Sequence, residues 1–472
     1  MNDFVKHARA PGNMVIVGFG SIGQGGLPLI LRHIEIKPEQ ITIITADERG
    51  ADEAKAYGIR FIQTPLTRDN YQSELDTLIH RGDFLVNLSV DVSSVALIEF
   101  CQARGAMYID TCIEPWAGGY TDPNKPFSAR SNYALREKML ALKEKYPNGP
   151  TAVVAQGANP GMVSHLVKQA LINLQKDILG TDTIPKTREQ WGKLAQKLNI
   201  EVIHIAERDT QITDKPKQMG EFVNTWSCDG FVSEGSQPAE LGWGTHEKHF
   251  PKDGGRHESG CDASIYLKRP GATVKVRTWT PNYGHFHGFL ITHNEAISIA
   301  DYFTLRDSGK VIYRPTCHYA YHPCDNAVMS LHEFNGKNFQ MQERQRVMRD
   351  EIIDGMDELG VLLAGHKKNA YWYGSQLTIQ EARELAPFNG PTSLQVTCAV
   401  LAGIVWAIEN PKAGIVESDE MDFQRNMEVM LPYLGPVIGQ YTDWTPLHER
   451  GELYEEDVDN DYAWQFKNVR VV

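Results

Sequence analysis

The chain has 472 residues, of which 42% are hydrophobic and 23% are charged. This composition is typical of a globular protein of about two or three domains and excludes a disordered chain. Lys and Arg number 47 against 60 Asp and Glu, so the formal net charge is -13. An acidic surface argues against a nucleic-acid partner and favours a cationic small molecule.

No segment is predicted to leave the cytoplasm or to enter a membrane. The start, Met1–Gly12, has charged residues and no apolar stretch of the kind found in signal peptides. The longest unbroken apolar run, Cys398–Ile408, has eleven residues, whereas a membrane span needs about 20. Seven widely spaced cysteines fit reduced thiols. We expect a cytoplasmic protein without a membrane partner.

Apolar, β-rich runs alternate with helix-like stretches through the first third of the chain. Continuous apolar strands separated by amphipathic helices indicate a parallel sheet covered on both faces, and six strands make a complete doubly wound Rossmann domain. We therefore predict an α/β fold with a nucleotide-binding domain over residues 1–158. Its strands are Met14–Gly18, Ile41–Thr45, Phe61–Gln63, Phe84–Asn87, Met107–Asp110 and Ala152–Ala155, and its helices are Ile22–Ile34, Ala51–Tyr57, Asn70–Ile79, Ser93–Arg104 and Ala134–Tyr146.

The pattern changes after Pro160, and a mixed α+β second domain is predicted over residues 159–390. A C-terminal segment, 391–472, contains a helix at Ser393–Glu409, which we expect to pack back on the first domain, and ends in a solvated acidic tail. The second domain begins with a helix at Met162–Gln175, followed by strands at Val202–Ile205, Glu221–Trp226, Thr273–Trp279 and Gly288–His293.

A glycine-rich loop follows the first predicted strand. Gly18, Gly20 and Gly23 have the G-x-G-x-x-G spacing at the start of a helix. Gly18 permits a tight turn, Gly20 lets the backbone approach a pyrophosphate, and Gly23 allows close helix–strand contact. The loop predicts a dinucleotide site, with Ser21 and Ile22 at the helix N-terminus that faces the phosphates. The alternative is a glycine-rich turn in an unrelated α/β domain.

The second predicted strand is followed by Ala46 and Asp47. An acid at this position binds the adenosine ribose hydroxyls and repels a 2′-phosphate, so Asp47 favours NAD over NADP. Two alternatives stay open. Arg49 is able to pair with a 2′-phosphate, and Asp47 is a residue type that caps helices.

Polar residues follow the later strands, at the edge of the sheet where ligands bind in such folds. Asn87 and Asp91 follow the fourth strand, Thr111 and Glu114 the fifth, and Asn159 the sixth. We expect these tips to gather around the nicotinamide. Asn87 and Thr111 are predicted cofactor contacts, while Asp91 and Glu114 supply carboxylates.

The second domain adds Glu207, Trp226 and Glu234 to this set. Carboxylates with a Trp form a receptor for ammonium groups, because the acids pair with the charge and the ring face attracts it. A receptor for a hydroxy or keto acid would instead need Arg or Lys. The simpler alternatives are that Asp91 caps the following helix, that Glu114 and Glu234 are exposed loop acids, and that Trp226 is a core residue.

No metal site is predicted. Two cysteines and two histidines lie within Cys317–Cys324, but their spacing differs from that of structural zinc pairs. His285 and His287 alternate on a predicted strand, where paired histidines without a metal are more common. Hydrolase, metalloprotease and NTPase motifs are lacking.

Five segments carry a resemblance to a known family: Val17–Gln24, Asn87–Asp91, Tyr108–Trp116, Gly157–Val163 and Trp226–Gly230. In these segments, and continuously over nearly the whole chain, the sequence resembles the bacterial homospermidine synthases, an offshoot of the saccharopine dehydrogenase-like oxidoreductases. The last four segments are much more specific than the glycine loop.

The resemblance implies a redox-neutral reaction in which NAD stays bound. Putrescine is oxidised to an imine, ammonia is lost, a second putrescine adds, and the new imine is reduced to homospermidine; related polyamines exchange aminobutyl groups in the same way. It also implies a homodimer and a second domain that serves substrate binding and dimerisation. By resemblance, the amine groups are held by Asp91, Glu114, Glu207 and Glu234, the cationic intermediate stacks on Trp226, and the reacting carbon lies beside Asn159 and His293.

The chemistry agrees with this implication. Removing hydride from an amine makes an iminium cation, which carboxylates and an aromatic face stabilise. A neutral amine must also form from an ammonium, so one group must accept a proton, and His293 is the predicted acceptor. The alternative for His293 is a structural role.

Two other functions remain as hypotheses. One is a saccharopine dehydrogenase-like enzyme with net NAD(P)H turnover, of the carboxynorspermidine or opine type. Its substrate would carry a carboxylate, so a basic residue in the pocket distinguishes it. The other is a nucleotide-sensing or scaffold protein that retains the Rossmann frame.

Overall fold

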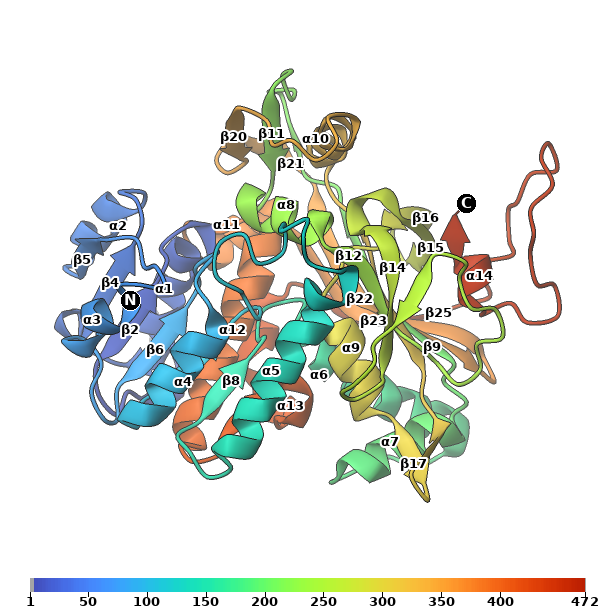
Figure 1. Cartoon of the computed structure of the whole chain (residues 1–472), viewed down its shortest axis with the longest axis horizontal. Helices are drawn as coiled ribbons and strands as arrows, with labels where there is room; N and C mark the ends of the chain where they lie inside the picture. The colour runs from blue at the N-terminus through green and yellow to red at the C-terminus, as the bar shows by residue number, and fades with distance from the viewer. Residues whose placement is uncertain (1–3, 472) are drawn as a thin grey trace.

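Seven parallel strands form the N-terminal sheet in the computed structural model, which describes residues 4–471 (Figure 1). Their order is β24-β8-β7-β6-β2-β4-β5, so the chain starts in the middle and winds outward in both directions. The predicted Rossmann sheet is confirmed. The strands are β2 Met14–Val17, β4 Ile41–Thr45, β5 Arg60–Gln63, β6 Phe84–Asn87, β7 Met107–Asp110, β8 Ala152–Val154 and β24 Ile415–Glu417.

Strand β2 shows why these segments have no polar face. Its alternate residues enter two different cores: Ile16 packs in one with Leu27, and Val15 packs in the other with Leu97. Both faces of a doubly wound sheet are covered, so each strand is apolar throughout. The helices that cover it are α1 Ser21–His33, α2 Ala51–Ala56, α3 Tyr71–Asp76, α4 Ser94–Arg104 and α5 Asn132–Lys145.

The C-terminal segment returns to this domain, as predicted. Helix α12, Pro391–Glu409, packs against α1 and against α13, Phe423–Met430. Figure 1 shows this pair in orange beside the blue strands. Strand β24 then extends the parallel sheet next to β8. Helix α12 is long and apolar enough to cross a membrane, but 89% of its most apolar window is buried inside the protein, so it serves as a core helix.

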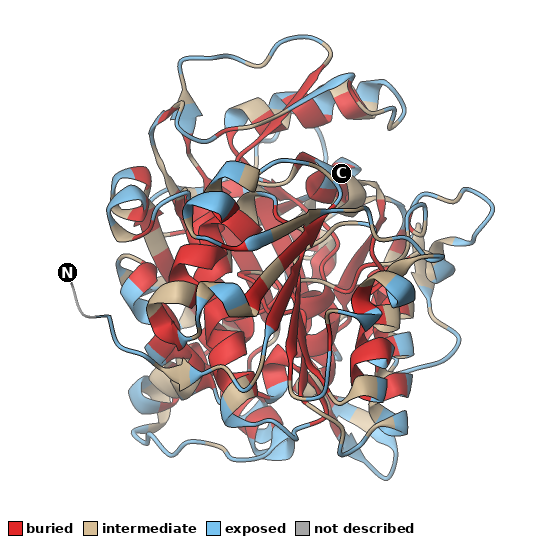
Figure 2. Ribbon diagram, turned by 90° about the vertical axis from the view of Figure 1, so that its left-hand side faces the viewer, coloured by how far each residue is buried: buried red, intermediate tan, exposed pale blue. Residues whose placement is uncertain are grey.

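An eleven-stranded sheet forms the second domain, beginning after helix α6, Met162–Leu174. Its long path runs β13-β14-β12-β19-β9-β22-β23-β25. Figure 2 shows buried residues, in red, in the interior of the molecule and exposed residues, in pale blue, on its outer loops. The members are β9 Val202–Asp209, β12 Pro238–Gly242, β13 Gly254–Arg256, β14 Ser264–Pro270, β15 Lys275–Thr280, β16 Gly284–Phe289, β19 Thr316–His322, β22 Met356–His366, β23 Asn369–Thr378, β25 Val437–Thr442 and β26 Arg470–Val471.

The remaining elements are short or lie outside this sheet. Strands β11 and β20 pair in a small lobe with α10, at the top of Figure 1. The elements are β1 Ala8–Arg9, β3 Ile34–Glu35, α7 Arg188–Lys197, β10 Ile212–Thr213, β11 Glu221–Asn224, α8 Cys228–Ser236, α9 Asn294–Tyr302, β17 Leu305–Asp307, β18 Lys310–Tyr313, α10 Asp325–Gly336, β20 Arg344–Val347, β21 Ile352–Asp354, α11 Ile379–Leu385 and α14 Phe466–Val469.

The structure corrects two expectations about the second domain. The predicted strand at Gly288–His293 lies at 284–289 instead, and His293 is the N-cap residue of α9. The long strand β22 was not predicted, because a continuous apolar run does not distinguish a buried strand from a buried helix. Ion pairs also hold the acidic C-terminal tail: Glu456 pairs with Arg277 at 3.3 Å and with Arg450.

A buried ion-pair cluster joins the two domains. Arg136 on α5 has a side chain that is 2% exposed. Its guanidinium donates two hydrogen bonds of 2.7 Å to Glu417 at the end of β24, and one of 2.9 Å to Asp301 on α9. Burial opposes a charged guanidinium, but the two carboxylates raise the pKa of Arg136 above its usual range. The cluster therefore stabilises the junction only while it is complete.

Replacing Arg136 by Ala should strongly destabilise the protein, because two buried carboxylates lose their cation. Breaking a buried pair costs about 3–5 kcal/mol. Arg188→Ala is the matched control, since Arg188 contacts the same Asp301 but its side chain is 49% exposed. We expect a large fall in the thermal unfolding midpoint for Arg136→Ala and a small one for Arg188→Ala. Equal falls would show that the cluster is not a specific tie between the domains.

Candidate active site

The glycine loop has the geometry of a pyrophosphate site. Gly18 adopts φ +84°, and a Cβ there would stand 2.8 Å from Ser89. A Cβ on Gly23 would stand 2.8 Å from the Phe19 ring, so both positions require glycine. At Gly20 nothing lies within 4 Å of a Cβ position, and no side chain caps α1 there. This open space before an uncapped helix N-terminus fits the phosphates of a dinucleotide. Ser21 and Ile22 form the first turn of α1.

Asp47 lies after β4, as the sequence predicts, but Arg49 engages both of its oxygens. The guanidinium donates to the carboxylate at 2.6–3.0 Å, and this contact lowers the pKa of Asp47. Asp47 does not cap a helix, since the N-cap residue of α2 is Gly50. Asp47 and Arg49 therefore present an ion pair where the adenosine ribose of a dinucleotide would bind.

A buried hydrogen-bond network joins the residues at the carboxyl ends of β6 and β7. Asn87 donates to the Tyr108 hydroxyl at 3.1 Å, and that hydroxyl donates to Asp110 at 2.8 Å. Burial raises the pKa of Asp110 to about 7. Thr111 follows, with its Cβ against Gly157. These contacts place Asn87 and Thr111 at the edge of the sheet where the cofactor was predicted.

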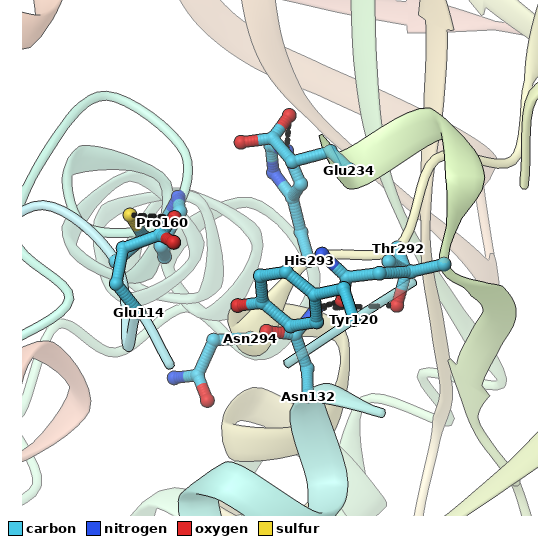
Figure 3. A pocket seen from close by; sticks show the side chains of 10 residues that line it. Glu114, Tyr120, Asn132, Pro160, Glu234, Thr292, His293 and Asn294 are labelled. Atoms are coloured by element: carbon cyan, nitrogen blue, oxygen red, sulfur yellow. Dashed lines mark hydrogen bonds and ion pairs between the residues drawn. The ribbon is translucent and has the colours of Figure 1, made fainter. Parts of the chain in front are cut away.

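Glu114 is buried in a pocket rather than exposed in a loop. It is 6% exposed and lies where the chain leaves β7 (Figure 3). The Cys112 thiol donates to one carboxylate oxygen at 3.3 Å, while the other oxygen is buried without a partner. Burial, with Glu234 and Asp91 nearby, raises the pKa of Glu114 to about 8. An unpaired carboxylate oxygen in a pocket is suited to receive a cation.

His293 and Glu234 form another wall of the same pocket (Figure 3). The His293 ring nitrogens contact Glu234 at 3.0 Å and Glu295 at 3.2 Å. Burial opposes a charged ring, but the two carboxylates raise the pKa of His293 to about 10. A ring held in its charged form by two carboxylates is a poor proton acceptor, so the geometry does not favour the predicted proton-acceptor role of His293. The Glu114 carboxyl, with a pKa of about 8, exchanges its proton more readily near neutral pH than this ring does.

Glu207 on β9 and Asn159 in the loop after β8 come together. Asn159 donates to Glu207 at 2.8 Å, and the Tyr319 hydroxyl donates to the same carboxylate oxygen. The loop that carries Asn159 is tight, because a Cβ on Gly161 would stand 2.2 Å from the carbonyl oxygen of Gly157. Burial raises the pKa of Glu207. The Asn159 and Tyr319 side chains thus hold Glu207 in one orientation.

Two further carboxylates lie behind Glu207. Asp209 follows it on β9, and Asp357 on β22 is the cross-strand neighbour of Asp209. Asp209 accepts from Gln211 and Thr225, and Asp357 accepts from Thr392. Burial raises the pKa of both acids. Burial and the neighbouring charges of Glu207 and Asp209 favour the protonated form of Asp357.

Trp226 lies beside this group. Its ring nitrogen donates to the Tyr321 hydroxyl at 3.2 Å, and its ring packs 5.3 Å from Phe231. The Trp is half-buried and is absent from the residues that line the pocket. Asp91 is exposed and adopts φ +64°, and Ser93 rather than Asp91 caps α4. The capping alternative for Asp91 is therefore wrong.

The structure thus gathers Glu114, Glu234 and His293 in one pocket, with Asn159 and Glu207 as a second buried group. The sequence analysis did not single out Glu295, Cys112 or the residues that complete the wall. The sequence could have indicated Tyr319. It alternates with Tyr321 on β19, so the two rings share one face of the strand, and the histidine before Tyr319 lies on the other face. The remaining wall residues are Tyr120, Asn132, Pro160, Gln237, Thr292 and Asn294.

This arrangement is suited to a small polycation. Buried carboxylates and aromatic faces stabilise positive charge as it develops on a substrate. Among the residues that line the pocket, within the part of the chain that the structure describes, none is Lys or Arg. The one cationic side chain in the wall, His293, is already paired with Glu234 and Glu295.

Comparisons with known proteins agree with the geometry. Residues 14–153 match the saccharopine dehydrogenase NADP binding domain, and residues 157–442 match the saccharopine dehydrogenase C-terminal domain. The chain is 55% identical to the homospermidine synthase of Blastochloris viridis, with 100% of both chains covered. It is 54% identical to that of Mesorhizobium japonicum, covering 98% of this chain and 97% of the relative.

Comparison with solved structures also finds a homospermidine synthase. The homospermidine synthase of Legionella pneumophila, in complex with NAD, is 49% identical, with 98% of both chains covered and a TM-score of 0.92. Saccharopine dehydrogenase from Saccharomyces cerevisiae is 11% identical, with a TM-score of 0.52 over 91% of this chain and 100% of that one, and shares the fold. The chain described here is an enzyme that belongs to the homospermidine synthase family.

Proposed function

We propose that this enzyme converts two molecules of putrescine into homospermidine and ammonia without net oxidation. One amine carbon is oxidised to an imine, the second diamine adds to that carbon as ammonia leaves, and the new imine is reduced. The observation that carries the proposal is a pocket with two carboxylates, Glu114 and Glu234, and with no Lys or Arg among the described residues of its wall. It disfavours the carboxylated substrates of an opine-type dehydrogenase.

NAD is the proposed cofactor. When bound, it would supply the acceptor for the substrate's hydride and then its donor. Gly18, Gly20 and Gly23 would hold the pyrophosphate, and the carboxylate of Asp47 would favour ribose hydroxyls over a 2′-phosphate. The open space at Gly20 and the uncapped start of α1 support this placement.

The buried acids would bind the amine groups of the diamine. Glu114 has one oxygen without a partner, and Glu234 is held by His293 at 3.0 Å, so their carboxylates are oriented before substrate arrives. Glu207 and Asn159 would hold a second nitrogen, with Asp91 nearer the entrance. Preorganised charge of this kind needs no reorganisation when the iminium forms.

Glu114 would also take the proton that an ammonium loses before oxidation. Its pKa of about 8 lies near the operating pH, which is the favourable range for an acid–base group. His293 would remain an imidazolium that keeps Glu234 and Glu295 in place. The enzyme is further proposed to be a cytoplasmic homodimer whose cysteines are reduced. Light scattering tests the dimer.

Incubating the enzyme with putrescine and a catalytic amount of NAD should give homospermidine and ammonia in equal amounts, with no NADH left at the end. Mass spectrometry and absorbance at the NADH band measure both. Replacing NAD by NADP at the same concentration should give less product. NADH that accumulates with each product would instead identify a simple dehydrogenase, and bound NAD without turnover would identify a sensor.

Glu114→Gln should fold, bind NAD normally and lose at least about tenfold in putrescine turnover, because a charge-assisted hydrogen bond of about 1.5–3 kcal/mol is removed. Glu114→Asp should be intermediate, since the charge remains but the reach is shorter. Glu189→Gln is a suitable control, because Glu189 is exposed on α7. Unchanged turnover in Glu114→Gln would mean that the diamine is held elsewhere.

Trp226→Ala should lower kcat by about thirtyfold, since a cation–π contact at a desolvated site contributes about 2 kcal/mol. Trp226→Phe should keep part of the activity because it retains a ring face. Trp191→Phe is the matched control, as Trp191 packs against Phe423 in the core. A Trp226→Ala variant that melts early but turns over normally would show that this ring has a core role only.

A further inference from the structure

Tyr319 occupies the centre of the buried polar group and has no role in the reaction as proposed so far. It lies on β19, is 3% exposed, and pairs in register with Ile205 of β9. Its hydroxyl contacts Glu207, and its ring contacts His293. Tyr319 therefore contacts both the Glu207–Asn159 group and the His293–Glu234 group.

The hydroxyl acts as a hydrogen-bond donor. Burial, together with the nearby charge of Glu207, raises the pKa of Tyr319 well above its usual range, so the phenol keeps its proton. A protonated phenol beside a carboxylate donates to it, and this bond favours the charged form of Glu207. Asn159 donates to the same oxygen at 2.8 Å.

The ring supports the other group. Its centroid lies 4.4 Å from that of the His293 imidazole, with a tilt of 32° between the planes. The Tyr321 ring stacks on Tyr319 with a centroid distance of 5.3 Å and is nearly parallel to it, at 9°. An imidazolium on a tyrosine face gains a cation–π contact, so the ring fixes the position of His293.

We propose that Tyr319 is a positioning residue that keeps Glu207 charged and oriented for an amine nitrogen of the substrate, while its ring holds His293 in place. The inference rests on the proposed function and deepens it. Tyr319 acts through Glu207 and His293 and does not itself react.

The ionisable groups that surround Glu207 determine how this role depends on pH. Asp209 comes from the same strand, Asp357 from β22, Tyr319 and Tyr321 from β19, and His293 from the segment before α9. Burial and the neighbouring acids raise the pKa of Glu207, whereas the Tyr319 and Asn159 hydrogen bonds and His293 lower it. Losing the Tyr319 hydroxyl must raise that pKa further. Activity that needs the carboxylate would then fail at a higher pH than in the wild type.

The test compares Tyr319→Phe with the wild type from pH 6 to 10, using kcat/KM for putrescine at saturating NAD. The ratio of wild type to variant cancels groups that titrate alike in both. We expect a loss of about tenfold or more near pH 7, shrinking to about threefold or less at the alkaline end, as the acidic limb moves upward by about one pH unit. The affinity for NAD should not change.

Two further variants separate this role from a packing effect. Tyr313→Phe is the matched control, because Tyr313 is also buried and donates its hydroxyl, at 2.8 Å, to the backbone of Ile200. It should change stability without moving the pH profile. Site-specific 3-fluorotyrosine at position 319 keeps the shape but strengthens the donor, so it should move the acidic limb to lower pH.

The outcomes are distinct. A wild type that makes no homospermidine overturns the proposed function itself. An active wild type with a pH-independent ratio in Tyr319→Phe, or with an unmoved limb in the 3-fluorotyrosine protein, overturns only the role of Tyr319. Opposite shifts of the limb in the two variants support it.

Discussion

The structure of this enzyme depends on keeping several carboxylates out of water at one place between two domains. An ionised acid in a dry interior is costly unless it has donors, so each acid must find them in the surrounding chain. Glu207 takes its donors from the loop after β8 and from β19. Among the residues that the structure describes, the Cys112 thiol donates to one oxygen of Glu114, and the other oxygen has no partner. The site is therefore short of positive charge until a cation binds.

That shortage explains the distribution of protons. Burial raises the pKa of Glu114 to about 8, while two flanking acids raise the pKa of His293 to about 10. The flanking acids thus keep the imidazole of His293 charged, and burial favours the protonated form of the Glu114 carboxyl. A diamine that enters replaces missing positive charge, and this favours its binding.

The domain junction makes such a site workable. The backbone packs closely at Gly18 and Gly161, where a Cβ would clash, and this close packing positions the two loops that carry these glycines. Arg136 neutralises the other buried acids of the junction, Glu417 and Asp301, away from the pocket. The scaffold acids are paired with a permanent cation, and the pocket acids are not. The carboxylates that stabilise the domain junction are thus different from the carboxylates of the pocket.

The sequence by itself determined the Rossmann domain, its strand limits and the dinucleotide loop, because these rest on local periodicity and on glycine spacing. It also indicated the acids at the strand ends, since parallel strands bring their carboxyl ends to one edge. Only the tertiary structure decided the eleven-stranded second sheet, whose pairings join residues far apart in the chain. It also decided the charge of His293 and the central place of Tyr319, because proton affinity depends on burial and on neighbours that no local pattern contains.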